Sequence, residues 1–238
     1  MSLIIESRII IGAGITITPE LPIVTNGLSM WLDANDSASY PGTGTTWADL
    51  SGNGADQTLI GSPAYTSASA SYFSFNGVSQ YATGSTPYVL PPNTYTKMVW
   101  FQFDAAADNN IVSSDTGGHY MYAASSSTLW AGNSNVFPYS GGGAFGSSTS
   151  FNTGTWYCAT VVFSSPQIYL YVNGVQDQVD LTYSVSGHPG DGSVNLACYG
   201  PGGNLLNGKI AEVYCYSRAL SAGEVLQNFN ATRSKYGV

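Results

Sequence analysis

Paired carboxylates would give this chain the simplest catalytic chemistry, since a retaining glycosidase needs two of them about 5–5.5 Å apart. The sequence has four glutamates, and no two of them are close together: Glu6, Glu20, Glu212 and Glu224. Asp177 and Asp180 are neighbours, but they follow a predicted turn, and we expect them in a solvated loop. The sequence therefore predicts no glycosidase site, and we expect the protein not to be an enzyme.

The sequence also gives no support for nucleophilic catalysis or for nucleotide binding. His119 and His188 are the only histidines, and no Gly-x-Ser-x-Gly motif accompanies them. His119 begins an aromatic run, whereas His188 precedes Pro-Gly and is expected in a turn. The glycine-rich stretches 12–16 and 141–146 lack the Lys-Ser/Thr that completes a phosphate-binding loop.

A calcium site is a candidate in the loop Asp-Leu-Ser-Gly-Asn-Gly-Ala-Asp at 49–56. Its oxygen-bearing side chains are Asp49, Asn53 and Asp56, and calcium prefers several carboxylate and carbonyl oxygens. The alternative is that Asp, Asn and Gly only form turns here. Calcium is the one cofactor that the sequence suggests.

A glycan site is a candidate in the aromatic segment 119–145. Sugars present apolar C–H faces and many hydroxyls, so they pair well with aromatic rings and amide groups. The candidate residues are Trp130, Tyr120, Tyr122, Asn133, Asn135 and Tyr139. The alternative is that alternate aromatics fill the core and the others cover a face of a sheet.

Composition restricts the fold and the partners. Of 238 residues, 43% are hydrophobic and only 8% are charged, which excludes disorder and charge-rich helical bundles. A net charge of −8 from six basic and fourteen acidic residues cannot neutralise phosphates, so we expect no nucleic-acid partner. Cys158, Cys198 and Cys215 lack zinc-site spacing and are expected as buried thiols, with one disulfide and an odd cysteine as the alternative.

Short β-prone runs separated by turn residues recur from Gly27 onward. Asn173-Gly174 predicts a two-residue hairpin, and Asn76-Gly77 suggests a second. Ser221 and Glu224 form a capping box that predicts one short C-terminal helix, ending near Ala231. The expected fold is all-β, an antiparallel jelly-roll β-sandwich spanning residues 27–238.

Residues 1–26 are predicted to form a separate extended arm for assembly. It is rich in isoleucine (Ile9, Ile10, Ile11, Ile15 and Ile17), and Pro19 and Pro22 end its regular structure. An uncovered isoleucine-rich strand promotes aggregation, so we expect it to be covered either by a neighbouring subunit or by its own domain as an edge strand. The segment reads neither as a signal peptide nor as a membrane span.

Four segments in order resemble concanavalin A-like, laminin G-type jelly-roll domains. They are the run from Gly27 through Trp47 to Gly54, YFSFNGVSQYAT at 72–83, the strands at 151–176 with their Asn-Gly hairpin, and the closing strand with its helix at 206–237. Hydrolases of this superfamily carry Glu-x-Asp-x-x-Glu on one strand, a motif that this chain lacks. Lectin-like members bind carbohydrate.

The tail QNFNATRSKYG and the isoleucine-rich start are similar to virion proteins of tailed phages that carry this domain. The resemblance implies a non-enzymatic homo-oligomer on the virion exterior, as a head decoration or a tail or fibre component. It would bind other virion subunits through the arm and also host-surface glycans, without inserting into a membrane. The alternative is a secreted, extracellular carbohydrate-binding module, and a glycoside hydrolase is a distant third.

Overall fold

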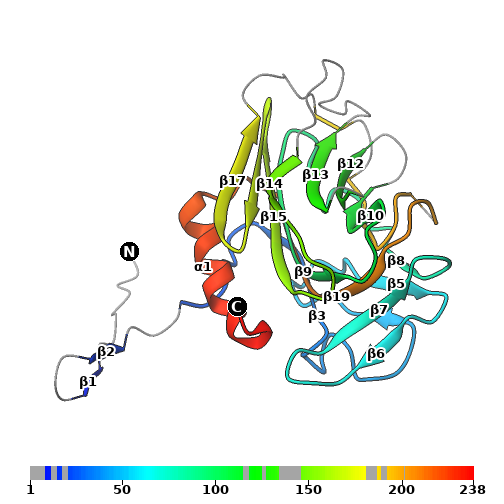
Figure 1. Cartoon of the computed structure of the whole chain (residues 1–238), viewed down its shortest axis with the longest axis horizontal. Coiled ribbons are helices and arrows are strands. Elements are labelled where there is room, and N and C mark those ends of the chain that lie inside the picture. Colours follow the sequence, from blue (N-terminus) through cyan, green and yellow to red (C-terminus); the bar gives the residue numbers. More distant parts are fainter. Residues whose placement is uncertain are drawn as a thin grey trace.

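The computed structural model describes residues 9–11, 15–17, 21–114, 118–124, 127–133, 146–180, 187–188, 192–200 and 202–238. Every strand pair in this part is antiparallel, and the strands form stacked sheets with one α-helix at the C-terminus (Figure 1). The predicted all-β jelly-roll sandwich with a short terminal helix is therefore confirmed.

The largest sheet has eight strands. In spatial order they are β17 (Val175–Asp180), β16 (Gln167–Val172), β15 (Tyr157–Ser164), β9 (Thr94–Phe103), β19 (Asn207–Tyr216), β7 (Tyr72–Asn76) and β6 (Ala64–Thr66), with β3 (Leu28–Asp33) paired to β19. Because β17 is a strand, the expectation that Asp177 and Asp180 lie in a loop is wrong. Asp177 accepts hydrogen bonds from Ser148 and Thr149 and so ties β17 to the opposing sheet.

Two smaller sheets lie opposite the large one. The first contains β11 (Val112–Ser113), β18 (Asn195–Leu196), β8 (Tyr81–Thr83), β5 (Gln57–Ile60) and β4 (Thr46–Trp47). The second contains β10 (Asn109–Asn110), β12 (His119–Ala123), β13 (Thr128–Asn133) and β14 (Gly146–Ser150). Since β7 and β8 join different sheets, Asn76-Gly77 is not a two-residue hairpin turn. Asn173 and Gly174 do form one, with φ of 49° and 75°.

Both faces of the large sheet are buried. Val99, Phe101 and Phe103 of β9 point into the core between the sheets, whereas Met98 and Trp100 point to the outer face. Helix α1 (Ala222–Thr232) and the 3₁₀ turn η1 (Arg233–Tyr236) pack on that outer face (Figure 1). The indole of Trp100 stacks on Tyr236 with ring centroids 4.0 Å apart. The helix and the 3₁₀ turn thus cover the apolar outer face of the large sheet and shield it from solvent.

The start of α1 has the predicted capping box. The Ser221 hydroxyl accepts from the Glu224 backbone N–H, and the Glu224 carboxylate accepts from the Ser221 N–H. Hydrogen bonds from Arg218, followed by those from Ser221, lower the pKa of Glu224 to about 2. Among the described residues no helix is both long and apolar enough to cross a bilayer.

The N-terminal segment contains a small hairpin. Strands β1 (Ile9–Ile11) and β2 (Ile15–Ile17) pair with each other and, within the described residues, with no other strand. After it, the chain is held by its own domain: Gln227 donates to the Pro22 carbonyl, and the Val24 N–H donates to Asn228. The three cysteines are buried and are not joined in disulfides, as expected.

Candidate functional site

The structure pairs one glutamate that the sequence left isolated. Glu212 of β19 faces Asp33 of β3 across the sheet, at a β-bulge that turns Glu212 toward the outer face. Both carboxylates accept from the Lys235 ammonium, at 2.6 Å for Glu212 and 3.1 Å for Asp33. The hydroxyls of Tyr214 and Tyr236 also donate to Glu212.

The two carboxylates are buried and ion-paired with Lys235, which is not the arrangement of a catalytic acid pair. Glu212 is 0% exposed, and among the described residues the cation that pairs with both acids is Lys235 of η1. Burial, and then the nearby Asp33 charge, raise the pKa of Glu212, and the Lys235 ammonium opposes this rise. The group therefore fastens the C-terminal turn to the sheet.

The candidate calcium loop is organised by Asp49 itself. Its Oδ1 accepts from the N–H groups of Trp31 and Ser51, and its Oδ2 accepts from Ser51 Oγ and from two further loop N–H groups, those of Asn53 and Ala55. Asp56 accepts from the Asp49 N–H, and Asn53 donates to the Leu28 carbonyl. With these oxygens engaged, the loop as arranged does not fit a calcium ion, and its geometry suits the turn-forming alternative. In the part of the chain described, no group of three or more His, Cys, Asp or Glu is arranged to hold a metal.

Asp49→Asn should lower the free energy of unfolding by about 1–2 kcal/mol, because it replaces charge-assisted hydrogen bonds with neutral ones and converts one acceptor to a donor. Thermal denaturation with and without millimolar calcium measures both points. We expect no calcium-dependent shift of the wild-type Tm. If calcium raises the Tm of the wild-type protein but not that of Asp49→Asn, the loop is a metal site instead.

The outer face of the β10–β12–β13–β14 sheet carries the aromatic residues. Met121, Leu129 and Ala131 of β12 and β13 point into the core, so Tyr120, Tyr122 and Trp130 share the opposite face. Ring centroids lie 6.0 Å apart for Tyr120–Tyr122 and 5.8 Å for Tyr122–Trp130. Three of the predicted residues are therefore brought together.

Gly132 sets the position of Tyr120. It lies directly across from Tyr120 in the ladder, and a Cβ at this glycine would fall 1.9 Å from the Tyr120 hydroxyl oxygen. The phenol ring thus lies over the glycine, where a side chain would otherwise stand. This close approach leaves Tyr120 only 3% exposed although it is on an outer face.

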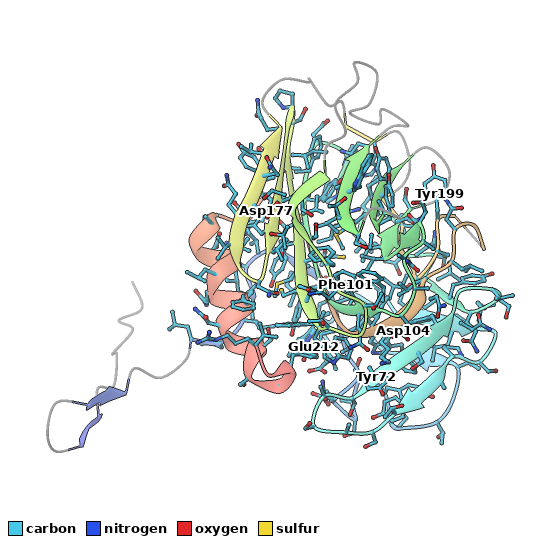
Figure 2. The ribbon with its side chains drawn as sticks, in the orientation of Figure 1. Tyr72, Phe101, Asp104, Asp177, Tyr199 and Glu212 are labelled. Atoms are coloured by element: carbon cyan, nitrogen blue, oxygen red, sulfur yellow. The ribbon has the colours of Figure 1, made fainter. Side chains whose placement is uncertain are left out.

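A pocket of about 340 Å³ opens beside these rings. Its described lining residues are Asp108, Asn110, Tyr120, Tyr122, Tyr199 and Asn204. Asn110 belongs to β10, which pairs with Tyr122 of β12, and its N–H donates to the Asn204 carbonyl. Two backbone hydrogen bonds between Tyr199 and Gly203 shape the turn that supplies Tyr199 (Figure 2).

The pocket combines aromatic surface with an unused acceptor. Within the described part of the chain, the Asn110 side-chain oxygen is buried and has no hydrogen-bond partner, which is uncommon for a buried polar atom. Burial, followed by the neighbouring Asp108 charge, raises the pKa of Tyr122 to about 12, so its phenol stays a neutral donor. Such a site can stack an apolar ring face and accept from a ligand hydroxyl.

The remaining candidates for this site are placed elsewhere or lie outside the description. Asn133 lies on the core side of β13, where its Oδ1 accepts from the Tyr95 hydroxyl at 2.5 Å, and it does not line the pocket. Trp130 supports Tyr122 from beside it and is not among the described lining residues. Asn135 and Tyr139 fall outside the described residues.

Four of the pocket-lining residues were not predicted from the sequence: Asp108, Asn110, Tyr199 and Asn204. They join the tyrosines only through strand pairing and a turn that are distant in sequence. The polar run Asp-Asn-Asn at 108–110 was the available signal.

A second groove of about 320 Å³ lies near the start of β3. Tyr88, 65% exposed with φ of 59°, stands at its edge. Its polar side chains are already used within the protein: Ser29 donates to the Val89 carbonyl, Asn53 to Leu28 and Thr86 to Gly54. The tyrosine-lined pocket is therefore the better candidate for a binding site.

The two histidines are structural. His119 and His188 are buried with ring centroids 5.4 Å apart, and the His119 Nδ1 lies 3.0 Å from the ammonium nitrogen of the buried Lys97. Burial, then the charges of Lys97 and His188, hold the pKa of His119 well below its usual range. The cluster sits inside the sandwich and away from the pocket lining.

Comparison with solved structures shows similar folds at low identity. Domain 4 of AbnA, an extracellular arabinanase from Geobacillus stearothermophilus solved with arabinotriose, has a TM-score of 0.64 and 16% identity, covering 84% of this chain and 97% of that one. A botulinum neurotoxin serotype D/C binding domain has a TM-score of 0.66 and 12% identity over 87% of this chain and 52% of that one. Trypanosoma rangeli sialidase has a TM-score of 0.57 and 14% identity over 88% and 33%.

This chain thus spans about half of the neurotoxin binding domain and a third of the sialidase. No curated protein sequence matches it significantly. Residues 75–226 match the laminin G-type family described as the concanavalin A-like lectin/glucanases superfamily, which is more than half of the chain. With its antiparallel sandwich, this protein belongs to the concanavalin A-like lectin/glucanase superfamily.

Proposed function

We propose that the protein is a non-enzymatic carbohydrate-binding module whose site is the pocket lined by Tyr120, Tyr122 and Tyr199. The observation that carries this proposal is the buried Asn110 oxygen beside an aromatic wall, an acceptor that no described residue bonds. A saccharide hydroxyl would satisfy that oxygen while its C–H face packs on the Tyr122 ring.

The similar structures support a carbohydrate-binding role in general, without identifying the sugar. Structures of similar fold include an arabinanase domain in complex with arabinotriose, a botulinum neurotoxin binding domain in complex with SialylT and a sialidase in complex with sialic acid. At 12–16% identity they share only the fold, so the sugar identity must come from this pocket's own residues.

Tyr122→Ala and Asn110→Ala should each weaken glycan binding about five- to thirtyfold, since aromatic stacking and a hydrogen bond to a buried acceptor each contribute about 1–2 kcal/mol. A glycan array identifies a ligand, and calorimetry then compares the variants with wild type. Tyr88→Ala is the matched control, because it removes an exposed tyrosine from the second groove. If Tyr88→Ala abolishes binding and Tyr122→Ala does not, the pocket is the wrong site.

The non-enzymatic part of the proposal rests on the placement of the acids. Asp108 is the one carboxylate among the described pocket-lining residues, and Asp33 with Glu212 is sealed by Lys235. A panel of β-glucans and of the array ligands should be recovered uncleaved. Turnover that is lost in Glu212→Gln would refute this part.

We further propose a place on the exterior of a phage particle, with a secreted lectin-like module as the alternative. In the described residues the β1–β2 hairpin pairs with none of the three other sheets, which leaves it available to a neighbouring subunit, while the segment 22–26 is anchored to the sandwich. Deleting residues 1–20 should abolish oligomerisation or particle attachment and leave the Tm of the sandwich unchanged. Unchanged assembly of the truncated chain would remove the arm from the account.

A further inference from the structure

The chain contains five Asn-Gly pairs, and all of them lie in the described part of the structure, at 26–27, 53–54, 76–77, 173–174 and 207–208. In such a pair the glycine nitrogen can attack the side-chain carbonyl carbon of the asparagine, because glycine has no side chain to block the approach. The attack forms a C–N bond, and the side-chain nitrogen takes up the glycine N–H proton and leaves as ammonia. Water then opens the resulting cyclic imide at one of its two carbonyls and gives aspartate or isoaspartate.

Two of the exposed pairs have their asparagine side chains fixed by hydrogen bonds. The Asn53 amide donates to the Leu28 carbonyl and to the Ser51 hydroxyl. The Asn76 oxygen accepts from two loop N–H groups, and its amide donates to Ser79. Ring closure at either site requires these bonds to break first.

Two further pairs are restrained within the sheets. The Asn173 side-chain oxygen accepts from the Cys158 N–H at 2.9 Å, and the Asn173 N–H donates to the Cys158 carbonyl. Gly208 is buried in β19 between β7 and β9. A Cβ at Gly208 would fall 2.2 Å from the Gln102 carbonyl oxygen, so the backbone has no room to turn its nitrogen toward the preceding side chain.

Asn26 differs from the other four asparagines. It is exposed, and in the described part of the chain its side chain makes no hydrogen bond. It precedes Gly27 in a β-turn that is closed by the hydrogen bond from the Leu28 N–H to the Thr25 carbonyl, and Gly27 has a φ of 77°. The Gly27 N–H donates to no acceptor among the described residues. Both reacting groups are therefore free to meet.

Arg218 is placed to activate the attacking nitrogen. Its Nε donates to the Asn26 carbonyl oxygen at 2.9 Å, and this oxygen belongs to the same peptide group as the Gly27 nitrogen. A cationic donor on that oxygen stabilises the negative charge that the peptide group acquires when the Gly27 N–H loses its proton. Two hydrogen bonds to the Glu224 carboxylate hold the guanidinium in place.

We propose that Asn26 is a site of spontaneous deamidation, and that the isoaspartate formed there loosens the junction between the N-terminal segment and the sandwich. Isoaspartate adds one carbon to the backbone between two parts that the fold holds. One is the segment 22–26, which Gln227 and Asn228 bind to α1 (Figure 1), and the other is β3. The turn hydrogen bond from Leu28 to Thr25 is the first contact that the longer backbone would disturb.

Peptide mapping by mass spectrometry tests the assignment, after incubation of the full chain at mildly alkaline pH. All five asparagines are compared in one sample. We expect Asn26 to convert at least tenfold faster than Asn53 and Asn76, because their hydrogen bonds add to the barrier for ring closure. Equal or faster conversion at either of those two residues would overturn the assignment.

Arg218→Met should slow conversion at Asn26 several-fold, since it removes the cationic donor. Faster conversion in this variant would overturn the activating role and would show that Arg218 restrains the turn instead.

Hydrogen exchange tests the consequence for the junction. The Val24 N–H, which donates to Asn228, should exchange several-fold faster in incubated wild-type protein than in fresh protein. Asn26→Gln should prevent this change because glutamine closes a larger ring slowly, whereas the matched control Asn76→Gln should not prevent it. Unchanged exchange in protein that carries isoaspartate at position 26 would overturn the loosening. No sugar enters these measurements, so their failure is separate from failure of the proposed function.

Discussion

Replacing Lys235 by Met should lower the free energy of unfolding by about 3–5 kcal/mol at pH 8, the effect expected when one partner of a buried ionic group is removed. Lys235 keeps 33% of its side chain exposed, whereas Glu212 and Asp33 beneath it are buried. Without the ammonium, two adjacent carboxylates would stay in a poorly solvated site. Chemical denaturation measured by tryptophan fluorescence reports the loss.

The pH dependence of this variant identifies the cause. Burial already raises the pKa of Glu212, and losing Lys235 removes the group that opposes the rise. Between its unfolded and folded pKa values, Glu212 binds more protons in the folded state, so stability increases as the pH falls. The defect of Lys235→Met should therefore shrink between pH 8 and pH 5.

Lys209→Met is the matched control, since its Nζ lies 3.8 Å from the partly exposed Asp104. Surface pairs of this kind contribute about 0–1 kcal/mol. A loss in Lys235→Met no larger than in Lys209→Met would contradict the assignment of a buried ionic cluster.

Wild-type protein should lose about 2 kcal/mol of stability between pH 6.5 and pH 5 because of His119. The pKa of this buried imidazole is held well below 6.5 in the fold, so in that window the unfolded state binds one more proton. Stability then falls by about 1.4 kcal/mol for each pH unit. The described titratable groups facing His119 are Lys97 and Tyr95 from β9 and His188, and Cys215 of β19 lies near Lys97.

His119→Gln isolates this contribution, since glutamine keeps polar atoms near Lys97 and Ser193 and does not titrate. Denaturant midpoints at pH 5 and pH 7.5 should differ less in the variant than in wild type. An identical difference would show that His119 is already protonated in the folded protein or retains its ordinary pKa.

Local sequence patterns were enough to predict the helix start and one hairpin. The candidate site, in contrast, depends on which strands pair, which a local pattern does not contain. Ser221 with Glu224, and Asn173 with Gly174, carry their geometry within a few residues, so the helix start and the hairpin were predictable. Asn76-Gly77 has the same residue types, but β7 and β8 leave for different sheets. A turn motif cannot report which strands will pair.

The same limit explains the site. Tyr120 and Tyr122 are two residues apart on β12, so the alternation of side chains along a strand places them on one face. Asn133 was a candidate from the same segment, but it lies three residues after Trp130 on β13, so alternation places it on the core side, where it accepts from Tyr95. Tyr199 reaches the pocket from a turn almost eighty residues away in sequence, a contact that no local pattern contains.

The most direct test of the central claim is a crystal structure of the protein with the tightest-binding oligosaccharide from the array. We expect an intact saccharide against the Tyr122 ring, with one hydroxyl donating to the Asn110 side-chain oxygen. A cleaved sugar, or a ligand seated in the groove beside Tyr88 with the tyrosine-lined pocket empty, would contradict it.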